Sequence, residues 1–195
     1  MENILSIFVK AVFVENMVFA FFFGMCSYIA VSKSVKTAMG LGIAVTFVMV
    51  TTVPLNYLLN EYVLSPGALA WINPEFGTDG AHPVDLSFLS FIVFIAVIAS
   101  FVQLVEMVVE KFTPTLYNQL GIFLPLIAVN CAILGGSLFM QEREYATLGE
   151  ASAFALGSGV GWWLAIVLMA AIREKMAYSN VPAPLQGAGI TFILT

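Results

Sequence analysis

Two cysteines are the side chains of this sequence that offer the most distinctive chemistry. Cys26 stands in FFFGMCSYIA and Cys131 in LIAVNCAILGG, each beside small residues inside an apolar run. A free cysteine often packs as a small hydrophobic residue, and this interpretation stays open. A thiolate is also a metal ligand, but a [2Fe–2S] cluster takes four protein ligands. Because the chain has only two cysteines, a cluster here would need two more from a second, similar subunit. The chain has no CxxC pair, so the cysteine pattern alone is not specific for a metal.

Two carboxylates, Glu15 and Glu106, also lie in apolar stretches. An ionisable group inside a membrane is costly and is therefore a functional candidate. Glu106 has Gln103 one helical turn before it. Both acids are candidate residues of an ion pathway. The alternative is that each lies close enough to a membrane face to reach headgroups or a neighbouring subunit.

The composition excludes a soluble globular domain. The 195 residues are 61% hydrophobic and 10% charged, with a mean hydropathy of +0.98. Soluble domains carry about 25% charged residues. A bilayer core about 30 Å thick needs roughly 20 apolar residues per helix. We therefore expect an all-α integral membrane protein. The net charge of -5 and the absence of a basic cluster argue against a nucleic-acid partner.

The apolar runs predict six transmembrane helices in a single domain over residues 1–195. The sixth has eleven residues, which rise only about 16 Å, so we expect a helix cut short at Thr195. The predicted spans are 4–31 (with its membrane part at 13–31), 38–59, 86–109, 120–140, 151–172 and 185–195.

The basic residues predict the orientation. Five of the seven lie after the first, third and fifth spans, which marks that side as cytoplasmic. The N-terminus and the acidic loop 61–85 then face the outside. These five residues are Lys33, Lys36, Lys111, Arg173 and Lys175.

Weak self-similarity divides the chain into halves of about 1–112 and 113–195. Each half has a cysteine in its first span and a glycine pair opening its second. Three spans per half give the halves opposite orientations, the inverted repeat typical of transporters. Inversion would place the cysteines on opposite sides of the midplane, where they could face one shared site.

Three glycines lie beside the cysteines and could break the helices there: Gly24, Gly135 and Gly136. The GxxxG spacing of Gly157 and Gly161 predicts close helix packing.

Several stretches carry a resemblance to a known family. VENMVFAFFFGMC, LYNQLGIFLPLIAVNCAILGG, GSGVGWWLAIV and AIREKMAYSNVPAPLQGAGITFI are similar to the E subunits of sodium-translocating NADH:quinone oxidoreductases. The A subunits of the related Rnf complexes share the GIFLPLI and NCA elements. Two features depart from the family: the loop 66–83 is longer than usual, and the final helix is short.

The resemblance implies a bacterial inner-membrane complex of six subunits, A to F, with the N-terminus of this chain on the periplasmic side. It implies that this chain is a subunit of an NADH:ubiquinone reductase (Na⁺-transporting), which is a translocase that exports sodium. One [2Fe–2S] cluster would be shared with the homologous D subunit, and its ligands here would be Cys26 and Cys131. NADH, flavins and quinone would bind to other subunits.

A function of a different class is a cofactor-free secondary transporter or channel, a hypothesis that rests on the inverted repeat and the intramembrane acids alone. The iron and acid-labile sulfide content of the purified complex distinguishes the two hypotheses.

Overall fold

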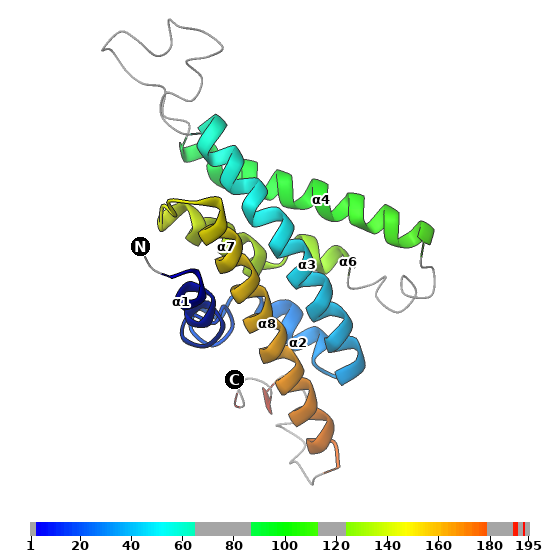
Figure 1. Ribbon diagram of the computed structural model, residues 1–195. Coiled ribbons are helices and arrows are strands. Elements are labelled where there is room, and N and C mark those ends of the chain that lie inside the picture. Colours follow the sequence, from blue (N-terminus) through cyan, green and yellow to red (C-terminus); the bar gives the residue numbers. More distant parts are fainter. Residues whose placement is uncertain (1–2, 65–86, 113–123, 179–188, 191–192, 194–195) are drawn as a thin grey trace, which may run out of the picture.

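All regular secondary structure in the described part of the chain is helical (Figure 1). The structure, a computed structural model, describes residues 3–64, 87–112, 124–178, 189–190 and 193. Four helical stretches are long and apolar enough to cross a membrane: Val35–Leu64, Ser90–Phe112, Pro125–Glu142 and Leu148–Met176. The predicted all-α membrane fold is therefore confirmed. Most of the sixth predicted span and most of the loop 61–85 lie outside the described residues. In chain order the elements are α1 (Ile4–Val9), η1 (Lys10–Val14), α2 (Met25–Val31), α3 (Val35–Leu59), η2 (Asn60–Leu64), η5 (Ser87–Leu89), α4 (Ser90–Phe112), α6 (Leu124–Ala128), α7 (Cys131–Glu142) and α8 (Leu148–Met176).

The long helices α3 and α8 form an antiparallel pair at the centre of the molecule (Figure 1). Glycines let them approach closely. A β-carbon on Gly42 would lie 1.9 Å from Cδ1 of Trp163, and one on Gly159 would lie 3.0 Å from Cα of Thr46. The predicted second and fifth spans correspond to these two helices, and the third corresponds to α4, which crosses α3 obliquely.

The N-terminal helices run parallel to α8. A β-carbon on Gly157 would lie 2.8 Å from the carbonyl oxygen of Phe8, and one on Gly161 would lie 2.9 Å from that of Val12. This contact confirms the close packing predicted from the GxxxG spacing. Phe8 lies beside Gly157 and Val12 beside Gly161, so residue numbers rise in the same direction along both segments. The start of α1 therefore lies near the start of α8.

The first predicted span is not a continuous helix, and the prediction of one over 13–31 is wrong. The regular backbone hydrogen bonding of a helix stops at Glu15 and resumes at Met25. Between them Phe22 and Gly24 have left-handed φ angles of 58° and 80°, which interrupt a right-handed helix. In this break, hydrogen bonds of a side chain take the place of the missing helical backbone hydrogen bonds. Asn16 accepts from the N–H of Val18 at 3.0 Å and donates to the carbonyl oxygen of Gly161 at 2.8 Å.

The fourth predicted span is also broken, so the expectation of one helix over 120–140 is wrong as well. Helix α6 ends at Ala128 and α7 begins at Cys131. Asn130 caps α7, because its Oδ1 accepts a hydrogen bond from the N–H of Ala132 at 3.0 Å. Asparagine at this position favours a helix start over continuation of the preceding helix.

Polar contacts tie the segments together at both ends of the α3–α8 pair. At one end Arg173 donates to the carbonyl oxygen of Ile29 at 3.0 Å and to Oγ of Ser32 at 2.6 Å. At the other end the hydroxyl of Tyr57 donates to the carbonyl oxygen of Tyr145 at 3.1 Å. The basic residues after α2 and in the last turn of α8 therefore share one end, and α1 begins near the opposite end.

Candidate functional site

The starts of α2 and α7 meet beside α8. Gly24 is the residue before α2, and Asn130 is the residue before α7. A β-carbon on Gly24 would lie 2.8 Å from Oδ1 of Asn130 and 2.6 Å from Nε1 of Trp162. Only glycine fits this contact, which brings together segments about a hundred residues apart.

This meeting point lies near the middle of the membrane-spanning part. Trp162 is the central residue of α8, with residues 148–161 before it and 163–176 after it. The 29 residues of α8 extend about 43 Å. Because a bilayer core is about 30 Å thick, the centre of such a helix lies close to mid-depth. From this level α2 and α7 run toward opposite ends of the molecule (Figure 1).

Both cysteines lie in the first turns of these two helices. Cys26 is the second residue of α2 and Cys131 is the first residue of α7. Both are free and exposed, whereas Gly24, Asn130 and Trp162 beside them are buried. Neither cysteine is therefore buried in the core of this chain. The two thiols instead face whatever surrounds this chain at mid-depth.

The groups around the cysteines suit an anionic metal centre. The start of α7 carries the partial positive charge of a helix N-terminus. Within the described residues, the amide nitrogen of Asn130 and the indole nitrogen of Trp162 are buried donors without a partner. No group of three or more His, Cys, Asp or Glu side chains gathers among those residues. The site therefore fits a [2Fe–2S] group only as a pair of cysteine ligands completed by another subunit.

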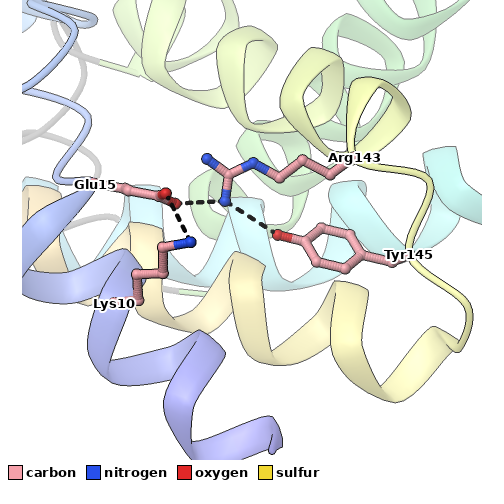
Figure 2. Close-up of polar contacts among 4 residues, drawn as sticks. All are labelled: Lys10, Glu15, Arg143 and Tyr145. Atoms are coloured by element: carbon pink, nitrogen blue, oxygen red, sulfur yellow. Dashed lines mark hydrogen bonds and ion pairs between the residues drawn. The ribbon is translucent and has the colours of Figure 1, made fainter. Parts of the chain in front are cut away.

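Glu15 belongs to a separate ionic cluster (Figure 2). Its carboxylate accepts a hydrogen bond from Arg143 and lies 3.3 Å from Nζ of Lys10. Arg143 also donates to the hydroxyl of Tyr145 at 3.4 Å. Burial opposes the charge of Arg143, but its hydrogen bonds to Glu15 and Tyr145 outweigh that effect and raise its pKa. Glu15 is thus a paired carboxylate that joins the first segment to the turn between α7 and α8.

A pocket of about 600 Å³ opens at this ionic cluster. It lies at the end of the molecule where α8 begins. Burial raises the pKa of the Tyr145 hydroxyl, which therefore stays protonated at neutral pH. The lining residues are Ile7, Lys10, Glu15, Arg143, Glu144, Tyr145, Ala146 and Glu150.

Glu106 is placed differently. It is half-buried on α4, where Gln103 is exposed one turn before it. Within the described part of the chain, no hydrogen bond or ion pair involves the Glu106 carboxylate. It does not line the pocket at Glu15. The structure therefore does not bring the two acids together.

Comparison with known proteins decides the family. A model of the Rnf-Nqr subunit family of membrane proteins matches residues 4–195. The chain belongs to the Rnf-Nqr family. The family resemblance stated from the sequence motifs is thereby confirmed.

Several Rnf-Nqr relatives cover nearly the whole chain. A protein of Stutzerimonas stutzeri (strain A1501) is 58% identical over 193 residues, which cover 99% of this chain and 92% of the relative. One from Maridesulfovibrio salexigens is 58% identical over 194 residues, covering 100% and 92%. One from Psychrobacter cryohalolentis is 55% identical over 193 residues, covering 99% and 92%. All three are named as the E subunit of a Na(+)-translocating NADH-quinone reductase.

The sequence did not identify three residues that position the candidate sites of this Rnf-Nqr chain. Asn16 holds the first break against α8, Trp162 adjoins Gly24, and Arg143 pairs with Glu15. An asparagine beside an intramembrane acid was a usable signal for the first. Gly24, which Trp162 contacts, and Glu15, with which Arg143 pairs, are each more than a hundred residues away in the sequence, so no local pattern indicates these two contacts.

Proposed function

We propose that this chain is the E subunit of a sodium-translocating NADH–quinone reductase. In this proposal Cys26 and Cys131 hold one side of an intramembrane [2Fe–2S] cluster, and the homologous D subunit supplies the other two ligands. The observation that carries the proposal is the pair of exposed cysteines at the starts of two oppositely directed half-helices, at the level of the centre of α8. The names of the relatives support the identity of the complex.

The residues of this chain have defined tasks in the proposed site. Gly24 allows the two helix starts to meet, and Asn130 fixes the first turn of α7 beneath Cys131. The contact of Asn16 with Gly161 holds the first break at the level of Trp162. A bound [2Fe–2S] group would supply one-electron transfer at mid-depth of the membrane. The partners of this chain in the proposed complex are the A, B, C, D and F subunits. Because the chain contains no glycine-rich nucleotide-binding loop, NADH would bind among these partners, and the proposal places flavins and quinone there too.

The proposed fold is an inverted repeat of two three-helix halves, 1–112 and 113–195. Each half opens with a broken segment that has a cysteine after its break, and a long helix follows, α3 in the first half and α8 in the second. The opposite directions of α2 and α7 support inversion. The sixth helix at 185–195 would complete the second half.

The proposed location is a bacterial inner membrane with the N-terminus on the periplasmic side. Ala146→Cys, in the exposed turn before α8, should then react with an impermeant thiol reagent added to intact cells. Ser34→Cys, exposed at the opposite end, should react only after the cells are opened. Unsubstituted protein measures the background from the native cysteines. Labelling of Ser34→Cys but not Ala146→Cys in intact cells would reverse the topology.

We further propose that Glu106 takes part in sodium entry and Glu15 in sodium exit. Electron transfer into the membrane adds a negative charge in a medium of low dielectric constant. An approaching cation lowers the electrostatic free energy that this charge costs. Reduction and sodium binding would then favour each other reciprocally. The absence of an ionic partner for Glu106 among the described residues supports its availability to a cation.

Glu106→Gln should raise the sodium concentration needed for half-maximal quinone reduction by about fivefold or more, because a coupling energy of about 1 kcal/mol or more is removed. The measurement is a sodium titration of turnover, with iron content determined in parallel. Glu110→Gln is the matched control, because Glu110 is exposed one turn further along α4. Equal sodium responses of both variants and the unsubstituted complex would remove Glu106 from the pathway.

The proposal as a whole is tested against a cofactor-free transporter. Purified complex should contain iron and acid-labile sulfide that are lost when a cysteine of this chain is replaced. An active preparation that contains no iron would favour the transporter.

A further inference from the structure

Two hydrogen-bond donors lie buried and unused where α2 and α7 begin. Nδ2 of Asn130 and Nε1 of Trp162 have no partner within the described residues, and these side chains are 1% and 0% exposed. The other end of the Asn130 amide is occupied, because Oδ1 accepts from Ala132. A buried donor without an acceptor costs about 1–3 kcal/mol, so a pair of them at one place calls for an explanation.

The position of these donors relates them to the cysteines. Asn130 directly precedes Cys131 in the chain. Nε1 of Trp162 lies 2.6 Å from where a β-carbon of Gly24 would be, and Gly24 is two residues before Cys26. The cysteines are exposed and the donors are buried, so the donors lie on the protein side of the two helix starts that carry the cysteines.

We propose, on the basis of the [2Fe–2S] site proposed above, that Trp162 and Asn130 are positioning residues that raise the reduction potential of the centre held by Cys26 and Cys131. Their N–H groups place fixed partial positive charge behind the sulfur ligands. Reduction adds one negative charge in a medium of low dielectric, where such dipoles stabilise the reduced state more than the oxidised state. Hydrogen-bond donors around the sulfurs are among the main determinants of iron–sulfur potentials.

Trp163 provides a matched control within the same helix. Its indole N–H is also buried without a partner in the described part of the chain. Its ring, however, packs against Gly42 of α3, away from the starts of α2 and α7. The two tryptophans therefore differ in their location relative to the cysteines, while they share chemistry and helix.

The test is a redox titration of the purified complex monitored by electron paramagnetic resonance. The signal of this centre is identified as the one that Cys26→Ala removes. Trp162→Phe keeps an aromatic ring and removes the N–H, and Asn130→Ser keeps a helix-capping oxygen and removes the amide donor. Each should lower the reduction equilibrium constant about tenfold, which is about 59 mV for a one-electron couple. Trp163→Phe should leave the midpoint at the unsubstituted value.

Unchanged midpoints in both Trp162→Phe and Asn130→Ser, with the signal intact, would overturn this inference and leave the proposed function standing. If Trp162→Phe prevents assembly of the centre, the midpoint of Asn130→Ser decides alone. If Cys26→Ala removes no signal, the proposed function itself fails. The two failures are therefore distinguishable.

Discussion

Replacement of either cysteine, Cys26→Ala or Cys131→Ala, should abolish NADH-driven quinone reduction by the complex. In the proposed site each exposed thiol is one of the four ligands that a [2Fe–2S] group requires, and the described part of the chain gathers no alternative ligand set. Electron flow should then stop at the membrane step. NADH oxidation by artificial acceptors should persist, because in the proposed complex NADH and flavins bind to other subunits.

The measurement combines turnover with the iron and acid-labile sulfide content of the purified complex. Each variant should lose two irons and two sulfides relative to the unsubstituted complex. Val129→Ala is the matched control, because Val129 is 69% exposed two residues before Cys131 and has no ligand atom. Unaltered iron, sulfide and turnover in the cysteine variants would refute the assignment.

Gly24→Ala should destabilise the same site without removing a ligand. The residue has a φ of 80°, and its β-carbon would lie 2.6 Å from Nε1 of Trp162 and 2.8 Å from Oδ1 of Asn130. The left-handed backbone costs a non-glycine residue about 1–2 kcal/mol, and overpacking adds about 1–3 kcal/mol. The expected destabilisation of about 2–5 kcal/mol should separate the starts of α2 and α7 and reduce the content of the centre.

Thermal unfolding of the purified complex and its iron content measure this effect together. Gly149→Ala is the control, because a β-carbon there meets its nearest atoms only at 3.9 Å, in the first turn of α8. That variant should unfold at or slightly above the original temperature. A Gly24→Ala complex with the same stability and iron content as Gly149→Ala would show that the helix starts need no close contact.

The unbroken helices were predictable because their apolar runs are long enough to span a bilayer. The predicted spans 38–59 and 151–172 fall within α3 and α8, and 86–109 largely overlaps α4. Hydropathy predicts such helices well because the hydrocarbon core imposes their length.

The two breaks were not predictable by the same rule. The runs around Cys26 and Cys131 are as apolar as a continuous span, so hydropathy does not register the interruption. What breaks them is local and specific: a left-handed Gly24, the capping carboxamide of Asn130 and the hydrogen bonds of Asn16 to Val18 and Gly161. The sequence indicated that glycines near the cysteines could break helices. Gly24 does so, whereas Gly135 and Gly136 lie inside α7.

The candidate ion-pathway acids illustrate a different limit. Glu15 and Glu106 were chosen because a carboxylate in an apolar run is costly. The run itself does not reveal that Glu15 meets Arg143 across 128 positions of the chain. A basic partner that the tertiary structure supplies changes which cations such an acid can bind. Of these two acids, only Glu106 has no ionic partner among the described residues.

The most direct test of the shared centre is a high-resolution map of the complete complex. The account predicts metal density at mid-depth that touches the sulfurs of Cys26 and Cys131 and two further cysteine sulfurs from one neighbouring membrane subunit. Density that shows both thiols covered by lipid or apolar side chains, with no metal between them, in a preparation that reduces quinone, would contradict it.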